Sequence, residues 1–178
     1  MIIEIKGGGF INKGAQLMLQ TLIAEKNWFS DDCKFVMHMA SGSFADRNSC
    51  QLGHLAWLHT WNYLPAAILT DTFFSCLSRK VRKKYNIWLK NEIEGVLDIS
   101  GFIYSDHFGP KPCNRMADYY RQLRNAGAKI IIMPQAMGPF ENPDVKASVL
   151  EIIDAAELVF IRDEVSFGHV TELAGRLE

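Results

Sequence analysis

Residues 129–161, KIIIMPQAMGPFENPDVKASVLEIIDAAELVFI, contain the pattern that decides the fold. Lys129 to Met133 is an almost continuous apolar run, which is typical of a strand covered on both faces in a parallel sheet. Asn142 and Pro143 form a favourable N-cap and first-turn pair, and apolar residues follow them at helical spacing. Leu158 to Ile161 is the next apolar run. The stretch therefore predicts a strand, a helix and another strand.

The same alternation extends along the chain. Further strands are predicted at Ile2 to Ile5, Cys33 to Ala40 and Gly95 to Ile103, and further helices at 15–23, from Pro112 to Gly127, and from Asp163 onward with Phe167, Val170, Ala174 and Leu177 on one face. The pattern is less regular from Asp46 to Lys90, where Leu55 to Leu69 is predicted to be a buried helix or strand pair. The alternation predicts an α/β fold, a Rossmann-like, doubly wound, mainly parallel sheet with right-handed crossovers.

Composition limits the function classes. A chain of 178 residues, 48% apolar and 22% charged, is expected to form a single α/β domain over residues 1–178. Its formal net charge of -1 gives no reason to expect nucleic acid as a partner. The four cysteines form no C-x-x-C pair and the five histidines no H-x-x-x-H pair, so no metal site is indicated. The charges at the N-terminus do not match an export signal, so a cytoplasmic location is expected.

One dense basic cluster stands out. It consists of Arg79, Lys80, Arg82, Lys83 and Lys84. A solvated helix face is the usual meaning of such a cluster. If the substrate is attached to a lipid carrier, the same charges would hold the protein at the inner face of the membrane. The oligomeric state is left open by the sequence.

Ligands in doubly wound sheets bind beyond the carboxyl ends of the strands, so the loops there are expected to form the site. The loop from Gly7 to Gly14 matches neither the dinucleotide nor the P-loop spacing. A tight turn and a binding role for Asn12 and Gly14 are about equally favoured. In Pro134 to Phe140, Gln135 offers both a donor and an acceptor for a sugar hydroxyl, and Gly138 marks a sharp turn, which is the competing structural explanation.

Two further loops carry charged residues. Asp163 is placed to cap its helix while pairing with Arg162, although an arginine there is also suited to bind phosphate or carboxylate bidentately. Asp98 falls inside an apolar run and is expected to make a buried hydrogen bond. Asp106 is the better candidate for acid, base or hydroxyl-anchoring chemistry, and the adjacent His107 is either a proton-transfer group or an ordinary surface histidine.

The order of these loops resembles the polysaccharide pyruvyl transferase family. An N-x-G loop corresponds to Asn12-Lys13-Gly14, a D-x-x-x-x-G segment to the stretch from Asp98 to Asp106, a Q-x-x-G-P-F segment to Gln135 to Phe140, and an R-D-x-x-S segment to Arg162 to Ser166. The last two segments, in order and about twenty residues apart, are the most specific part of the resemblance. The chain departs from the family at Ala15, where Asp is common, and at Ser100-Gly101-Phe102, where the family is richer in glycine.

The resemblance implies transfer of the pyruvyl group of phosphoenolpyruvate to a sugar of a cell-surface polysaccharide precursor, as a ketal and without a cofactor. It implies catalytic roles for Asp106 and Arg162 and substrate-binding roles for Asn12, Gly14, Gly101, Gln135, Gly138, Asp163 and Ser166. The partner is a saccharide acceptor, free or lipid-linked.

The resemblance also implies a two-lobed, glycosyltransferase-B-like architecture, of which this chain is the N-terminal lobe. The sequence stops at Glu178 inside a predicted helix, so the second lobe is expected to be absent and the chain alone to bind acceptor weakly, if at all. Two alternatives remain open. One is a glycosyltransferase that uses a nucleotide sugar, and the other is a non-catalytic domain that binds glycan or a protein partner.

Overall fold

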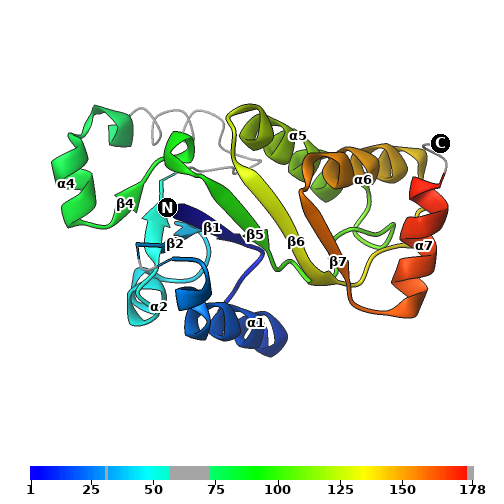
Figure 1. Ribbon diagram of the computed structural model, residues 1–178, viewed down its shortest axis with the longest axis horizontal. Helices are drawn as coiled ribbons and strands as arrows, with labels where there is room; N and C mark the ends of the chain where they lie inside the picture. The colour runs from blue at the N-terminus through cyan, green and yellow to red at the C-terminus, as the bar shows by residue number, and fades with distance from the viewer. Residues whose placement is uncertain (31, 57–72, 176–178) are drawn as a thin grey trace. The chain divides into compact units, whose positions relative to one another are not determined.

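The computed structural model describes residues 1–30, 32–56 and 73–175 (Figure 1). Its strands form one seven-stranded parallel sheet in the order β4-β3-β2-β1-β5-β6-β7. The first strands are added in one direction from β1, whereas β5, β6 and β7 are added in the other direction. This arrangement confirms the predicted α/β fold with a Rossmann-like, doubly wound parallel sheet.

The chain divides into two compact units, unit 1 from Met1 to Val96 and unit 2 from Leu97 to Glu178. Unit 1 contains β1 (Ile2–Lys6), α1 (Lys13–Ala24), η1 (Lys26–Trp28), β2 (Lys34–His38), α2 (Phe44–Ser49), β3 (Gly53–Leu55), α4 (Arg79–Lys84), β4 (Ile87–Trp88) and η2 (Lys90–Glu92). Strand β5 (Gly95–Asp98) contains the boundary, and unit 2 continues with α5 (Pro110–Asn125), β6 (Lys129–Gln135), α6 (Pro143–Ala155), β7 (Leu158–Ile161) and α7 (Glu164–Ala174). The expectation of a single domain stays a prediction.

Strands β1 and β2 of unit 1 follow the predicted apolar runs, whereas β3 and β4 were not predicted with these bounds. Parallel pairing joins Ile3 to Phe35 and Val36 to Gly53. Helix α1 covers the predicted 15–23 region and buries Leu19 and Leu22. The predicted helix or strand pair from Leu55 to Leu69 lies, beyond Ala56, outside the described residues.

The core of unit 2 lies under α5 and α6, which pack against each other (Figure 1). Met116, Tyr120 and Leu123 of α5 are buried, as their spacing predicted, and Val145 and Val149 of α6 are fully buried. Helix α6 begins as predicted, with Asn142 as N-cap and Pro143 in the first turn. These apolar helix faces contribute to the core of unit 2.

Two predicted boundaries and one predicted helix face are corrected by the structure. The strand predicted from Gly95 to Ile103 ends at Asp98, because the Asp98 carboxylate accepts the amide hydrogen of Ser100 at 2.8 Å and turns the chain. Helix α5 begins at Pro110, two residues before the predicted start at Pro112.

The third correction concerns the inward face of α7. Ser166, Val170 and Leu173 are its buried residues, whereas Phe167, predicted to face inward, is 61% exposed. The predicted continuation of this helix to Leu177 lies outside the described residues.

The basic cluster lies on α4, and it is not uniformly solvated. Arg82 is buried and pairs with Glu92 at 2.5 Å, and Arg79 lies 3.6 Å from the same carboxylate. The expectation of five solvent-facing charges is therefore wrong for Arg82. In the part of the chain that the structure describes, no helix has the length and apolar character needed to cross a membrane.

Candidate functional site

Two loops of unit 2 are bonded to each other at the carboxyl ends of their strands. The loop after β5 spans residues 99–109, and the loop after β6 spans residues 136–142. The Ala136 amide donates to the Gly101 carbonyl at 3.0 Å, and the Gly138 amide donates to the Tyr104 carbonyl at 2.9 Å. The Asp106 amide donates to the Pro139 carbonyl at 3.1 Å. These bonds place predicted site residues Gly101, Asp106 and Gly138 on one cross-linked double loop.

A buried carboxylate anchors the first of these loops. Asp98 has no exposed surface, and it accepts hydrogen bonds from the Ser100 hydroxyl at 2.5 Å, the Tyr120 hydroxyl at 2.7 Å and the Tyr104 hydroxyl. Burial, reinforced by the Asp98 charge, raises the pKa of Tyr104 and Tyr120 well above the ordinary value. The two phenols therefore remain neutral donors. This cluster makes the expected buried hydrogen bond of Asp98 and fixes the path of the chain.

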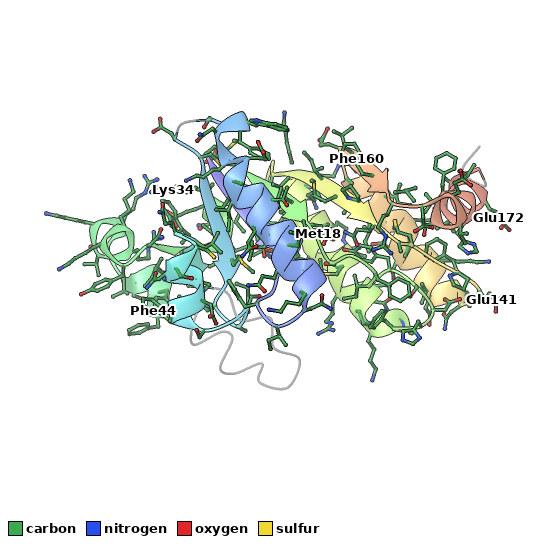
Figure 2. All side chains as sticks on the ribbon, turned by 90° about the horizontal axis from the view of Figure 1, so that it is seen from below. Met18, Lys34, Phe44, Glu141, Phe160 and Glu172 are labelled. Carbon is green, nitrogen blue, oxygen red and sulfur yellow. The ribbon has the colours of Figure 1, made fainter. Side chains whose placement is uncertain are left out.

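Asp106 faces backbone amides. Its carboxylate accepts from the Glu141 amide at 2.5 Å and from the Asn142 amide at 3.3 Å. Glu141 is exposed and lies near the end of the loop after β6 (Figure 2). Bonds of this kind join the two loops just before α6, which is a positioning role. The catalytic role of Asp106 stays a prediction.

Gln135 ends β6 and is completely buried. Its Nε2 donates to the Asp98 carbonyl at 3.1 Å, while its Oε1 has no partner among the described residues. The Asp98 carbonyl can only accept, so the amide orientation is fixed and the oxygen is the atom left unpaired. In this conformation the Gln135 side chain links the ends of β6 and β5 and does not face solvent.

The segment after β7 is bonded to the segment after β6. The Ser166 hydroxyl accepts from the Met137 amide at 2.9 Å, and the Arg162 amide donates to the Gln135 carbonyl at 2.9 Å. Asp163 caps α7 by accepting from the Ser166 amide at 2.9 Å, as predicted, and that interaction lowers its pKa. The two most specific segments of the family resemblance are therefore in direct contact.

Arg162 itself projects outward. Its side chain is 58% exposed, and its Nε lies 3.9 Å from the Asp163 carboxylate, which is the predicted pairing. At this exposure the pair adds little to stability. The guanidinium remains available to an anionic ligand.

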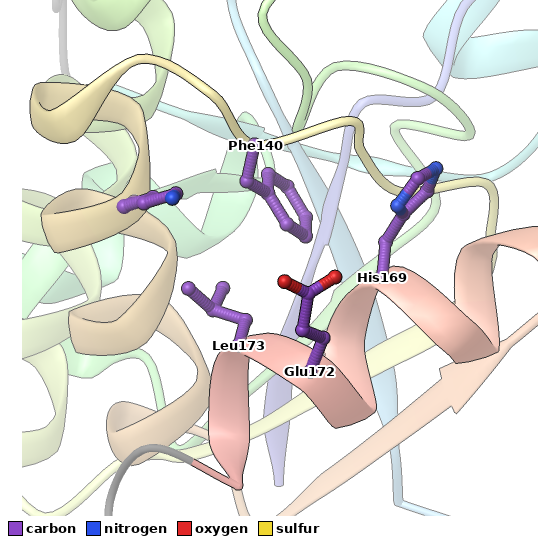
Figure 3. A pocket seen from close by; sticks show the side chains of 5 residues that line it. Phe140, His169, Glu172 and Leu173 are labelled. Carbon is purple, nitrogen blue, oxygen red and sulfur yellow. The ribbon is translucent and has the colours of Figure 1, made fainter.

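A small pocket lies beside the double loop. It encloses about 40 Å³ and is lined by Phe140, Lys146, His169, Glu172 and Leu173. Figure 3 shows Glu172 extending from α7 toward Phe140, with His169 on the same helix. The space admits water or a small ion, but it is too small for a sugar ring.

His169 was not identified from the sequence. Gly138 has a φ of 91°, and a Cβ built there would lie 2.7 Å from the His169 ring. The close contact explains why glycine stands at position 138. A single histidine on an amphipathic helix carries no sequence pattern that would have predicted this contact.

The loop after β5 also presents an exposed group of aromatic rings, which we call the ring cluster: Phe102, His107 and Phe108. Phe102 and Phe108 are 43% and 47% exposed, and their ring centroids are 5.6 Å apart. His107 lies 5.0 Å from the Phe108 ring and meets it edge-on. The ring cluster is thus a small exposed aromatic group on the cross-linked loop.

The two predicted site residues of unit 1 have a local structural role. Asn12 is the N-cap of α1, and its side-chain oxygen accepts from the amides of Gly14 at 2.9 Å and Ala15 at 3.2 Å. Capping explains the N-x-G spacing without a ligand. The substrate-binding roles of Asn12 and Gly14 stay predictions.

No protein-family model matches this sequence, and no curated protein matches it. The resemblance to the pyruvyl transferases therefore rests on the four sequence segments described above.

Proposed function

We propose that this chain is the saccharide-binding α/β lobe of a transferase that moves the pyruvyl group of phosphoenolpyruvate onto a sugar of a cell-surface polysaccharide precursor. The observation that carries the proposal is the direct contact between the Q-x-x-G-P-F and R-D-x-x-S segments, through Ser166 and Met137 at 2.9 Å. Each motif alone is a weak signal. The two together are stronger evidence, because they form one structural unit beyond the carboxyl ends of neighbouring strands.

The ring cluster supports a saccharide as the acceptor. Sugar rings expose C–H groups on one face and hydroxyls at the edge. Phe102 and Phe108 offer apolar ring surface, and His107 adds a group that donates or accepts hydrogen bonds. The loop bonds to Gly101, Tyr104 and Asp106 hold this surface in place before a ligand arrives, which reduces the entropy lost on binding.

Arg162 is the candidate for the donor. Its exposed guanidinium is suited to a carboxylate or phosphate, both of which phosphoenolpyruvate carries. We assign the reaction to the cytoplasm, where phosphoenolpyruvate is formed. The lysines of α4 then remain candidates for contact with a membrane that carries a lipid-linked acceptor, without the buried Arg82.

The test is transfer of label from carbon-labelled phosphoenolpyruvate to a panel of cell-envelope saccharides by the protein translated from the whole reading frame. Release of phosphate together with label in an acid-labile sugar ketal is the expected result. Label transferred from a sugar nucleotide instead would identify a glycosyltransferase. No transfer from either donor by a folded protein would overturn the transferase proposal.

Variants of the ring cluster connect this activity to the surface described here. Phe102→Leu and Phe108→Leu are expected to raise the KM for the saccharide by about three- to tenfold, since aromatic contacts contribute about 0.5–1.5 kcal/mol beyond burial. The KM for phosphoenolpyruvate should stay unchanged. Phe167→Leu, at an exposed phenylalanine of α7, is the matched control and should change neither constant.

A non-catalytic glycan-binding domain is the second candidate. It is favoured by the bonds of the Asp106 carboxylate to the amides of Glu141 and Asn142, because these contacts already explain that carboxylate. Saccharide binding that is weakened by Phe102→Leu, without transfer from either donor, would establish this candidate.

A further inference from the structure

Unit 1 contains two buried arginines, Arg47 and Arg82, which differ in whether a carboxylate pairs with the guanidinium. Arg82 is 7% exposed, and its Nη1 lies 2.5 Å from the Glu92 carboxylate. Arg47 is 4% exposed, and among the described residues no carboxylate lies within ion-pair distance of it. One buried cation therefore forms a direct ion pair, whereas the other has only the longer-range charge of the adjacent Asp46 carboxylate.

The contacts of Arg47 are all to neutral groups. Its Nη1 donates to the carbonyls of Met39, Ser41 and Gly42 at 2.8–2.9 Å, and its Nε donates to His54 Nδ1 at 3.0 Å. Its Nη2 donates to no group in the described part of the chain. A guanidinium has five N–H donors, so the group keeps unused donors on one nitrogen.

His54 extends the set of unused donors. It is 2% exposed, and because its Nδ1 accepts from Arg47, a neutral imidazole must carry its hydrogen on Nε2. That Nε2 has no partner among the described residues. Phe44 stacks on the imidazole at 4.5 Å between ring centroids and holds it in place.

The charge of Arg47 is only partly balanced within the described residues. Burying a cation is unfavourable unless an anion and additional hydrogen bonds compensate for the loss of water. The adjacent Asp46 acts on Arg47 through its charge but forms no direct ion pair with it. Carbonyl dipoles supply part of that compensation at Arg47, but they carry no net charge. By contrast, the charge of Arg82 in the same unit is compensated directly by the Glu92 carboxylate, which also lies close to Arg79.

Arg47 also lies at the carboxyl ends of the strands, which is the end where doubly wound sheets bind ligands. The three carbonyls that it holds belong to the loop after β2, and His54 lies on the neighbouring β3. Gly42 has a φ of 74°, and a Cβ there would lie 2.3 Å from the Phe10 ring, so the loop after β1 packs on this loop. Arg47 is thus built into the carboxyl-end loops of unit 1.

We propose that Arg47 is the centre of an oxyanion-binding site at the carboxyl end of β2, with a phosphate or carboxylate group as its ligand. Recognition comes from the Nη2 donors, which have no partner among the described residues, and from a guanidinium that forms no direct ion pair. His54 is a positioning residue, which orients the guanidinium through its Nδ1. The site does not depend on pyruvyl transfer, since any metabolite or carrier bearing such a group has the chemistry that Arg47 requires.

Titration calorimetry of the full chain with inorganic phosphate, and separately with acetate, tests the site. Binding of either anion with a Kd in the millimolar range or below is the expected result. Tighter binding of phosphate would identify a phosphate group as the preferred ligand, and tighter binding of acetate a carboxylate. Arg47→Gln is expected to weaken binding at least about tenfold, since a hydrogen bond to a charged group contributes about 1.5–3 kcal/mol. Arg82→Gln is the matched control and should leave the affinity within about twofold, because Glu92 occupies its guanidinium.

A measurement on the unaltered protein covers the case in which Arg47→Gln fails to fold. Titration with phosphate or acetate, followed by NMR, should shift the Arg47 Nε–H and His54 Nε2–H signals together and saturably. The N–H signals of Arg82 should not move. Absence of any shift up to high millimolar phosphate and acetate overturns the proposal, as does equal binding by a folded Arg47→Gln variant. Transfer activity enters neither experiment, so a failure here is separate from a failure of the proposed function.

Discussion

The hydroxyl oxygen of Ser166 accepts a hydrogen bond from the backbone amide of Met137 at 2.9 Å in the buried part of unit 2. This bond joins the N-terminal turn of α7 to the loop after β6. Ser166→Ala would leave a buried N–H without an acceptor, which costs about 1–3 kcal/mol of unfolding free energy. Urea unfolding of the two proteins measures the loss.

The matched control for that change is Ser49→Ala. Ser49 lies on α2, is exposed, and donates to the Asp46 carbonyl at 2.8 Å. Its replacement is expected to change stability by less than about 0.5 kcal/mol. Equal losses for both variants would contradict the importance assigned to the bond between Ser166 and Met137.

Local chemistry predicted much of this region. Asn142 and Asp163 were identified as N-caps from residue type and spacing alone, because a short polar side chain before an apolar periodic segment satisfies free helix amides. The end of β5 at Asp98 was not predicted, since Ile99, Phe102 and Ile103 continue the apolar composition. The bonds that Tyr104 and Tyr120 donate to Asp98 require the fold to be complete, and no local pattern encodes them.

The candidate site was predicted less completely than the fold. The sequence located Gly138 and Asp106 on loops at strand ends, which the sheet topology dictates. It also placed Gln135 on a loop, whereas the structure makes Gln135 the last residue of β6. It did not predict the ring contact of Phe102 with Phe108, because two exposed phenylalanines in a loop have no periodicity. A packing relationship such as this one becomes visible only when the path of the loop is known.

Gly138 is expected to be the least replaceable glycine of the double loop. Its φ of 91° disfavours a side chain, and a Cβ would lie 2.7 Å from the His169 ring. Gly138→Ala should lower the unfolding free energy by more than about 2 kcal/mol, from backbone strain of about 1–2 kcal/mol plus displacement of the ring. Thermal unfolding measures the effect.

Two further variants separate these causes. Removing the clashing ring in Gly138→Ala/His169→Ala should restore part of the loss, and the double-mutant cycle gives the coupling between the two positions. Gly168→Ala is the control on α7, where nothing lies within 4 Å of the added Cβ. It should stabilise the protein by about 0.5–1 kcal/mol, because alanine is favoured over glycine inside a helix.

Asp106 is expected to affect loop order whether or not it takes part in catalysis. Asp106→Asn removes the negative charge that accepts from the Glu141 and Asn142 amides. Hydrogen exchange at these two amides should accelerate, with a loss of about 1–2 kcal/mol of stability. Asp118→Asn, at an exposed carboxylate of α5 that pairs with Arg121, should leave both quantities nearly unchanged.

The same variant discriminates between the two roles of Asp106. If the carboxylate only positions the loops, any loss of pyruvyl transfer should follow the loss of loop order and be restored by conditions that stabilise the fold. Abolished transfer with unchanged exchange at Glu141 and Asn142 would instead identify Asp106 as a catalytic residue.

His54 is expected to make the stability of unit 1 depend on pH. Burial, and next the charge of Arg47, lowers the pKa of His54 from its ordinary value of 6.5. The unfolded chain therefore takes up a proton below about pH 6.5, while the folded protein keeps the imidazole neutral. The free energy of unfolding should fall as the pH decreases from about 6.5 toward about 5, above the range where the carboxylates titrate.

Replacement of the imidazole isolates this contribution. His54→Gln keeps an acceptor for the Arg47 Nε and removes the titrating group, so the slope of stability between about pH 6.5 and 5 should become smaller. Urea unfolding at a series of pH values compares this variant with the unaltered protein. An unchanged slope in His54→Gln would show that the neutral, buried imidazole beside Arg47 is not the source of the acid sensitivity.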